Sequence, residues 1–216
     1  MTKHPAVQNI KVAADAAIFT VENKQLKVLL IQMKKAPFAG EWALPGGLLG
    51  DEETSRQAVD RILTTQTGVK KVYLEQLMTF DDVQRDKLGR VISIAWFALI
   101  PNGGFKLKTT EKYADVRWWP VKALPKLAYD HAAIAKTAVS RLRAKLEYAN
   151  VAWSLLPAEF TLAELQNTYE SILGKPLDKR NFQKKYLALG LIKESGKMRT
   201  GGAYRPAKLY NFAKFV

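Results

Sequence analysis

The sequence predicts a larger domain of the α+β or α/β class, in which helices flank a mixed sheet, followed by a small basic domain of two helices and a hairpin. Three observations support this prediction. Strand-like apolar runs surround one central helix between residues 10 and 119, a long helix follows Asp130, and positive charge gathers near the end of the chain. We place the two domains at residues 1–148 and 149–216.

The composition indicates a folded protein with an anionic partner. Of the 216 residues 48% are hydrophobic, and the formal net charge is +14. The absence of cysteine excludes a disulfide framework and a thiolate metal site. Apolar runs such as residues 28–31 are too short to cross a bilayer, and the first residues lack the apolar core of a signal peptide. We therefore expect a cytoplasmic protein that has no membrane partner.

The elements of the first domain follow from apolar periodicity and from turn residues. Two strand-like runs flank a turn at Asn23 and Lys24 and predict a hairpin. A Pro- and Gly-rich loop with a short strand around Ala43 and Leu44 comes next, and a helical pattern then ends at Gly68. The expected strands cover residues 10–22, 26–33, 71–79, 90–100 and 115–119, and the expected helix covers residues 51–67.

A long helix is expected to close the first domain. Asp130 stands where a side-chain cap would begin it, and apolar residues recur at helical spacing as far as Leu146. Arg141, Arg143 and Lys145 lie near its end, where the helix dipole favours cations.

The second domain has the pattern of a winged helix-turn-helix. Thr161 and Glu164 form a predicted capping box, and Gly174 ends that helix. Asp178 begins a second helix, which ends at Gly190. Two short helices followed by a hairpin define this motif. The hairpin strands are expected at residues 191–193 and 208–212, around a basic loop at residues 195–206.

Positive charge is concentrated in this second domain. From Gly174 to Val216 there are eleven Lys and Arg residues but only Asp178 and Glu194 as acids, a net charge of +9. In the second helix, Phe182, Tyr186 and Leu189 repeat at helical spacing and should face the core. The opposite face and the wing then supply candidate contacts to DNA bases and phosphates. These candidates are Lys179, Arg180, Asn181, Gln183, Lys184, Lys185, Lys197, Arg199, Thr200, Tyr204 and Arg205.

Residues 47–69 resemble the signature of the Nudix hydrolase family. In that signature a glycine and a glutamate precede an Arg-Glu-apolar-any-Glu-Glu-any-Gly-apolar run at fixed spacing. The chain matches it at Gly47, Glu53, Arg61, Leu63, Gly68 and Val69. It departs from the signature at all of the glutamates after the arginine, where Ile62, Thr65 and Gln66 stand instead.

This departure predicts a domain without catalytic residues and without a bound metal. The three positions share one helix face, which in the family presents carboxylates to Mg²⁺ or Mn²⁺. Isoleucine cannot ligate, and threonine or glutamine offers only a neutral oxygen, so hydrolysis should fall by orders of magnitude. We expect the remaining Glu53 and Arg61 to form an ion pair that holds the loop on the helix.

A pocket without its catalyst can still bind a ligand. The segment around Arg85 and Arg90 is similar to that of Nudix members that handle ADP-ribose, and both arginines are candidate phosphate partners. Trp42 and Phe80 are candidate surfaces for stacking adenine, or ordinary core residues. The expected ligand-binding residues are Trp42, Gly46, Gly47, Glu53, Phe80, Arg85 and Arg90. His131 is expected to have a packing or capping role.

The segments at residues 129–148, 160–182 and 205–210 closely resemble the NrtR family of Nudix-related transcriptional regulators. This resemblance implies a repressor of NAD-metabolism genes that senses ADP-ribose or a related nucleotide, needs no cofactor, and binds palindromic double-stranded DNA as a homodimer. Three alternatives stay open. They are a regulator of pentose-sugar catabolism, a weak pyrophosphatase with Glu52, Glu53 or Asp81 as substitute ligands, and a nucleotide-binding adaptor for protein or RNA.

Overall fold

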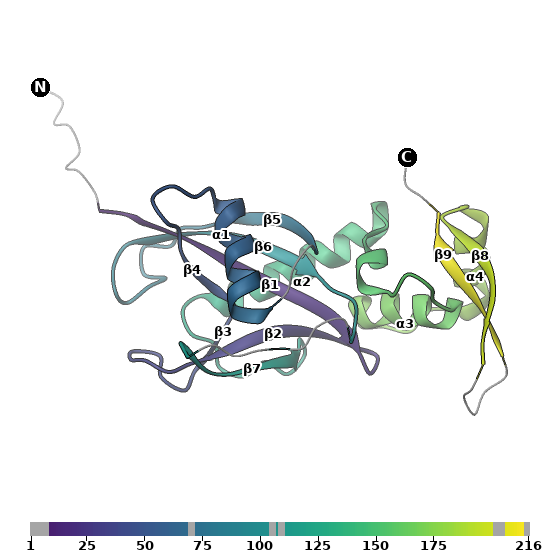
Figure 1. The fold of residues 1–216 in the computed structure, drawn as a ribbon, viewed down its shortest axis with the longest axis horizontal. Helices are drawn as coiled ribbons and strands as arrows, with labels where there is room; N and C mark the ends of the chain where they lie inside the picture. The colour runs from purple at the N-terminus through teal and green to yellow at the C-terminus, as the bar shows by residue number, and fades with distance from the viewer. Residues whose placement is uncertain (1–8, 69–71, 104–106, 108–110, 201–205, 214–216) are drawn as a thin grey trace, which may run out of the picture.

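The computed structural model describes residues 9–68, 72–103, 107, 111–200 and 206–213. The molecule is elongated, with a sheet at one end, a two-stranded hairpin at the other, and helices α2 and α3 between them (Figure 1). Within the described residues no helix is long and apolar enough to span a membrane.

A seven-stranded mixed sheet forms the first part of the chain. Its main path runs β3-β2-β1-β6-β5, with β4 added beside β1 and β7 beside β2. Strands β1 and β6 pair in parallel, and the other pairs are antiparallel. The strands are β1 (Lys11–Glu22), β2 (Gln25–Met33), β3 (Trp42–Ala43), β4 (Gly46–Leu48), β5 (Tyr73–Phe80), β6 (Val91–Leu99) and β7 (Tyr113–Pro120).

The predicted hairpin and strands are present, with one addition. Asn23 and Lys24 both have positive φ, 51° and 58°, the backbone that a two-residue hairpin turn requires. Glu22 then pairs with Gln25, which sets the register. Strand β4 was not expected, because glycines are poor strand formers by propensity. Here Gly46 and Gly47 lie opposite Asp15 and Ala14 of β1.

Both faces of the sheet are covered by a helix. Alternate residues of β1 point to opposite faces, so Ala14 and Ile18 pack with helix α1 (Ser55–Ile62) while Ala17 and Phe19 join the core beneath helix α2 (His131–Tyr148). The middle of β1 is consequently buried on both sides, as expected of a strand paired in parallel inside a layered fold.

The helix expected at residues 51–67 is shorter and less regular than predicted. It starts at Ser55, because Thr54 and Gln57 form a capping box that the pattern did not reveal. After Ile62 the chain continues as a π-helical turn, η1 (Leu63–Thr67), and Gly68 ends that turn with φ of 76°. Residues 51–54 therefore belong to the preceding loop.

The second part of the chain has the predicted helices and wing. A 3-10 turn, η2 (Val151–Leu155), leads into α3 (Leu162–Leu173) and α4 (Lys179–Ala188), and β8 (Ile192–Arg199) pairs with β9 (Ala207–Phe212). The capping box of Thr161 with Glu164 is present, and Asp178 caps α4 by accepting from the Asn181 N–H. Strand β8 is longer than expected.

The expected core face of α4 is correct for two residues and wrong for the third. Phe182 and Tyr186 are buried and form ring contacts with Tyr169 of α3. Leu189 is 51% exposed. It follows the last residue of α4, beyond the part of the helix that α3 covers.

One hydrophobic core joins the two parts. It extends from Phe97 in the sheet through Leu142 of α2 to Leu165 of α3 and Phe182 of α4. The predicted boundary at residues 148 and 149 falls just after α2, whose last helical residue is Tyr148. Helix α2 thus reaches from the first domain into the packing of the second.

Candidate functional site

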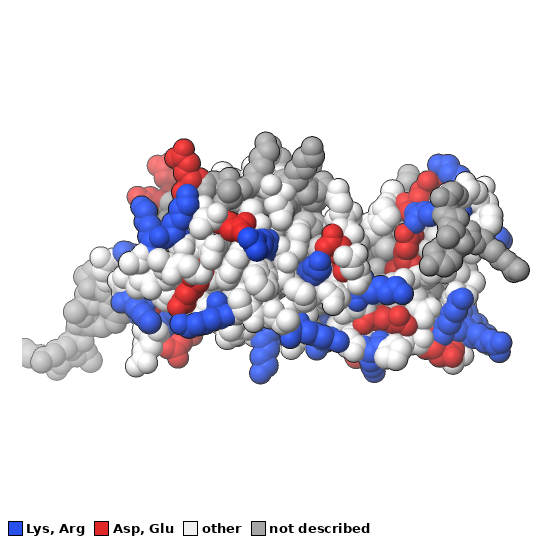
Figure 2. Space-filling view, turned by 90° about the horizontal axis from the view of Figure 1, so that it is seen from below, with Lys and Arg blue, Asp and Glu red and all other residues white. Residues whose placement is uncertain are grey.

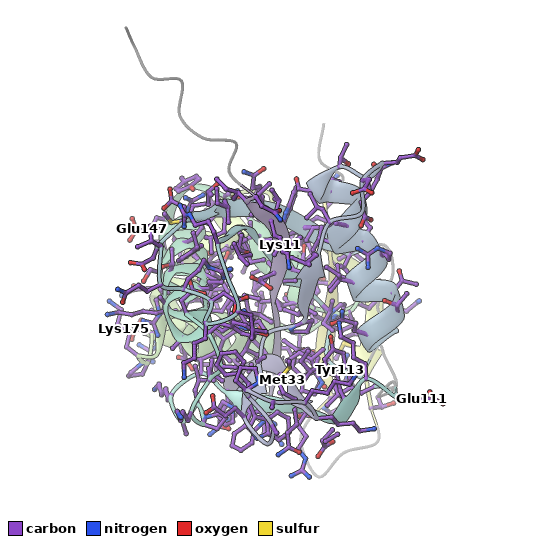
Figure 3. The ribbon with its side chains drawn as sticks, turned by 90° about the vertical axis from the view of Figure 1, so that its left-hand side faces the viewer. Lys11, Met33, Glu111, Tyr113, Glu147 and Lys175 are labelled. Atoms are coloured by element: carbon purple, nitrogen blue, oxygen red, sulfur yellow. The ribbon has the colours of Figure 1, made fainter. Side chains whose placement is uncertain are left out.

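A cavity of about 290 Å³ opens at the end of the sheet, on the face covered by α2. Figure 3 looks at this end of the molecule and labels Lys11, Met33 and Tyr113, which come from β1, β2 and β7 and all line the cavity. The other lining residues are Ala13, Asp15, Ile31, Ala43, Leu44, Gly46, Gly47, Leu48, Arg85, Asp86, Leu88, Val91, Lys112, Tyr129 and His131. The walls are mainly apolar, and the polar groups are few, as is usual for small-molecule sites.

The polar floor of the cavity is centred on Asp15. Its Oδ2 accepts a hydrogen bond from the Ser93 hydroxyl at 2.6 Å and lies 3.5 Å from Nε2 of His131. His131 Nδ1 accepts from the Leu44 backbone N–H at 2.9 Å. Because Nδ1 accepts from Leu44, the ring turns its Nε2 toward Asp15.

Arg85 connects this floor to the start of α2. Its Nε and Nη2 donate to Asp130 at 2.9 and 2.7 Å, and Nη2 also donates to Asp15 at 3.3 Å. The Arg85 side chain is 3% exposed, so the ion pair is buried. The expectation that Asp130 caps α2 with its side chain is wrong, since its carboxylate binds Arg85 and makes no capping hydrogen bond.

The charged groups at the floor are paired with one another. Burial opposes ionisation of Asp15, but His131, Ser93 and Arg85 outweigh it and lower the pKa of Asp15 below its usual value. The carboxylates of Asp15 and Asp130 both form ion pairs with the guanidinium of Arg85. Burial first, and then the charges of Tyr129 and Asp15, raise the pKa of Tyr113 to about 12, so its hydroxyl stays neutral.

Gly46 is required by a close approach. A Cβ at this position would stand 1.9 Å from Oδ1 of Asp15, which is closer than any side chain can lie. At Gly47 a Cβ would meet nothing within 4 Å. Both glycines, which the sequence suggested as ligand-binding residues, line the cavity, but only Gly46 is fixed by its neighbours.

Three of the predicted ligand residues, Trp42, Phe80 and Arg90, lie outside the cavity lining. Trp42 is 9% exposed and packs edge-on against Trp119 in the core. Phe80 is half-buried against the same core. Arg90 donates to the carbonyls of Asp81 and Asp82 and holds the loop between β5 and β6. Arg85 lines the cavity, and its Nε and Nη2 donate to the carboxylates of Asp15 and Asp130.

Glu53 and Arg61 form the expected ion pair. Both guanidinium nitrogens Nε and Nη2 of Arg61 donate to the Glu53 carboxylate, and Nη2 also donates to the Leu48 carbonyl. Glu53 further accepts from the Gly50 N–H at 2.6 Å, and the hydrogen bonds from Arg61 and Gly50 lower the pKa of Glu53. The pair fixes the loop on α1, away from the cavity lining.

The residues at the signature's glutamate positions do not fit a divalent metal. Ile62 is fully buried in the core beneath α1. The Thr65 hydroxyl donates back to the Arg61 carbonyl, and the Gln66 amide donates to the Gly46 carbonyl at 2.9 Å. Mg²⁺ and Mn²⁺ need several anionic oxygens, and these positions offer none. In the described part of the chain, no group of three or more His, Asp or Glu side chains could hold a metal ion.

The outer face of α4 is a candidate DNA interface. Lys179, Arg180, Asn181, Lys184 and Lys185 are exposed, and Gln183 is half-buried. Figure 2 shows Lys and Arg side chains at the winged-helix end, interspersed with Asp and Glu, and also along the rest of this face of the molecule. Basic and amide side chains on one open helix face suit the major groove.

The wing differs from α4 because its cations are paired within the protein. Lys197 lies 2.9 Å from Glu159, Arg199 pairs with Glu164, and Lys208 lies 2.8 Å from Glu194. Thr200 is exposed at the end of β8. The other two predicted contacts, Tyr204 and Arg205, lie outside the described residues.

The sequence pattern did not indicate two of the floor residues, Asp15 and Ser93. Asp15 sits in the middle of an apolar strand, which is a signal in itself, because a charged residue is rarely fully buried without a partner. Ser93 gave no comparable signal. Its meaning depends on the parallel pairing of β1 with β6, which places it beside Ala13 and within reach of Asp15.

Comparisons with known proteins agree with this architecture. Residues 11–142 match the NUDIX domain, and residues 152–212 match the NrtR DNA-binding winged helix domain. A Nudix domain joined by a helix to a winged helix defines a class of DNA-binding regulators. The chain belongs to one family of that class, the NrtR regulators, and is 36% identical over 203 residues to the "ADPR responsive transcriptional repressor NtrR" of Acinetobacter baylyi, covering 92% of this chain and 80% of the relative.

Structural similarity extends over both domains. The crystal structure of Shewanella oneidensis NrtR with a 27mer DNA superposes with a TM-score of 0.82 at 36% identity, covering 94% of this chain and 93% of that one. The NUDIX domain of the same Shewanella protein, in complex with ADP ribose, gives a TM-score of 0.57 at 35% identity and covers 65% of this chain and 94% of that chain.

An enzyme is also similar to the first domain. The ADP-ribose pyrophosphatase of Methanocaldococcus jannaschii is 38% identical over 133 residues, which covers 62% of this chain and 72% of the relative. The similarity therefore includes a regulator over nearly the whole chain and a hydrolase over the Nudix part.

Proposed function

We propose that this protein is a transcriptional repressor that binds palindromic double-stranded DNA through α4 and senses ADP-ribose in the cavity at the end of the sheet. The observation that supports this most directly is the helix that connects the two sites. One continuous helix, α2, begins at the cavity with His131 and ends within the core that holds the winged helix. NAD-biosynthesis genes are the proposed targets, and the cytoplasm is the proposed location.

Several contacts connect α2 to both sites. At its start, His131 lines the cavity, and the preceding Asp130 binds Arg85, another lining residue. Near its end, Arg143 Nε donates to the Ile172 carbonyl at the end of α3 at 2.8 Å, and Lys145 pairs with Glu75 of β5. A ligand that moves the floor would shift the equilibrium between arrangements of the winged helices, provided that it binds one arrangement more tightly than the other.

The proposed sensor does not hydrolyse its ligand and needs no cofactor. The buried Ile62 and the internally bonded Thr65 and Gln66 support this, since a pyrophosphatase of this fold relies on anions that hold a metal. Recognition of a palindrome would require two winged helices, so we further propose that the protein acts as a homodimer.

A weak pyrophosphatase is the second candidate, favoured by the similarity to the archaeal enzyme. Of its substitute ligands, Glu53 is already bound to Arg61 and the Gly50 N–H, while Glu52 and Asp81 are exposed. Metal-dependent release of AMP from ADP-ribose that is lost in Glu53→Gln would favour this candidate over the repressor.

The decisive experiment measures DNA binding with and without ligand. Genomic fragments selected by the purified protein would be titrated in a fluorescence anisotropy assay, with ADP-ribose, ribose 5-phosphate or no addition. We expect tight binding to a subset of duplexes and its loss on adding ADP-ribose. Equal affinity for every duplex at low salt, unaffected by either ligand, would rule the repressor out.

A further inference from the structure

The cavity floor holds a carboxylate oxygen directed at the cavity wall. Asp15 is 5% exposed. Its Oδ2 accepts hydrogen bonds from the Ser93 hydroxyl and from Arg85, and the Nε2 of His131 lies 3.5 Å away. Its other oxygen, Oδ1, lies against Gly46, another lining residue, and no described residue donates a hydrogen bond to it. An ionised carboxylate that lines a cavity favours a ligand group that can donate a hydrogen bond to it.

Charge along the cavity changes from the floor to the mouth. At the floor, the positive charge of Arg85 is paired with Asp15 and with Asp130 behind it. At the mouth, Lys11 and Lys112 are exposed, accompanied by the half-buried Asp86. A phosphate is therefore attracted more by the two lysines at the mouth than by the floor, where the Asp15 carboxylate lies.

The size of the cavity adds a further restriction. Its volume of about 290 Å³ is at the lower end of what small-molecule sites enclose. A ligand as long as ADP-ribose would be only partly enclosed, with the remainder at the mouth. An enclosed part that carries a hydroxyl or N–H group can donate a hydrogen bond to Asp15.

We infer that Asp15 determines ligand specificity by accepting a hydroxyl of a ribosyl group, which enters the cavity first and leaves the phosphates at the mouth beside Lys11 and Lys112. This assignment rests on the proposed sensing of ADP-ribose. It makes the terminal ribose, rather than adenine, the recognised part of the ligand. Arg85 then acts as a positioning residue, which holds the Asp15 carboxylate in place without touching the phosphates.

The matching variant is Asp15→Asn. Because three donors surround the Oδ2 position, the amide oxygen of asparagine would turn toward them, and its NH₂ group would replace Oδ1 at the cavity wall. The charged acceptor becomes a neutral donor, while the shape of the side chain is kept. A charge-assisted hydrogen bond of this kind corresponds to about a tenfold or larger change in affinity.

The experiment compares ligands within each protein by isothermal titration calorimetry. In the wild type, ADP-ribose should bind at least about tenfold more tightly than ADP, and in Asp15→Asn this ratio should fall to near one. Misfolding alone would weaken both ligands together and leave the ratio unchanged. Lys112→Met should weaken both ligands about equally, and Asp60→Asn, on the opposite face of the sheet, should change neither.

A second arm needs only the wild-type protein. Ribose 5-phosphate should displace ADP-ribose at least about tenfold more effectively than AMP does, because AMP presents adenine in place of the free ribosyl end. A wild type that binds ADP as tightly as ADP-ribose, or that is displaced better by AMP, would overturn the inference. An unchanged ratio in a folded Asp15→Asn variant would overturn it as well.

The ligand-affinity ratios test the assignment of Asp15 separately from the DNA-binding assay that tests the proposed repressor. If the ligand ratios follow the expectation but DNA binding ignores ADP-ribose, the repressor fails and the assignment of Asp15 stands. If ADP-ribose releases DNA but the Asp15→Asn ratio is unchanged, the assignment fails and the repressor stands.

Discussion

Arg85 donates two hydrogen bonds to the Asp130 carboxylate, from Nε at 2.9 Å and from Nη2 at 2.7 Å. The two residues are far apart in sequence, one in the loop between β5 and β6 and the other directly before α2. Their ion pair joins the loop that lines the cavity to the helix that leads to the winged domain.

Loss of Arg85 should be strongly destabilising. Arg85→Met would leave the buried Asp15 and the partly buried Asp130 without their cation, and breaking such a pair costs about 3–5 kcal/mol. Urea denaturation followed by circular dichroism measures this. Arg56→Met is the matched control, since the Arg56–Asp60 pair is more than half exposed and contributes about 0–1 kcal/mol. Equal losses in the two variants would contradict the role of Arg85.

Stability should depend on Asp15 at acidic pH. Because the folded pKa of Asp15 lies below the value of 3.8 for an unperturbed group, its ionisation contributes stability that is fully present above that value and lost as pH falls through the folded pKa. The difference in unfolding free energy between the wild type and Asp15→Asn should be constant from about pH 7 to pH 5 and should shrink below pH 4. A difference that grows on acidification would show that the sign is wrong.

Restoring one signature glutamate should damage the fold instead of creating a metal site. Ile62→Glu would place a carboxylate in a fully buried position and remove a core side chain, at a cost of at least about 3 kcal/mol. Thr65→Glu, nearby in η1 with a side chain at the surface, should cost less than about 1 kcal/mol. Thermal denaturation with and without Mg²⁺ tests both. Stabilisation of Ile62→Glu by Mg²⁺ would refute this account.

The two neighbouring glycines should respond differently to alanine. Gly46→Ala forces a methyl group against Asp15 Oδ1, so we expect about 1–3 kcal/mol of destabilisation. Gly47→Ala meets open space and should stay within about 0.5 kcal/mol of the wild type. Denaturation midpoints of the two variants, measured side by side, give the comparison. Equal midpoints would mean that Asp15 has room to move.

DNA affinity should depend steeply on salt. If each winged helix neutralises about five phosphates, a dimer should give a slope near −9 in a plot of log affinity against log salt. Lys184→Ala removes an exposed cation of α4 and should flatten that slope by about 1 per winged helix. Arg199→Ala should have a smaller effect, because Glu164 already neutralises Arg199. A larger effect at Arg199 would mean that DNA displaces Glu164.

Much of the fold could be predicted from the sequence, because its signals are local. The turn at Asn23 and Lys24, the capping box at Thr161 and the end of α3 at Gly174 each depend on neighbouring residues, and all are present. The π-helical turn and strand β4 could not be predicted, because tertiary contacts such as the hydrogen bond from Gln66 to Gly46 hold them.

The candidate site was less predictable. Arg85 was selected for its charge, but the carboxylates that engage it come from β1 and from the residue before α2, and no local pattern reveals that meeting. Trp42 was a candidate surface for stacking adenine or an ordinary core residue, and its contact with Trp119, distant in sequence, agrees with the core alternative. The NrtR resemblance supplied the domain order, and the comparisons confirm it.

The shared core also limits how this protein can be rebuilt. Leu142 and Leu146 of α2 pack in the same apolar cluster as Leu165 of α3. A winged helix separated from the chain after residue 148 would expose the apolar surface that packs against α2, and it would tend to aggregate. Anyone grafting this DNA reader onto a foreign sensor should transplant the second half of α2 with it.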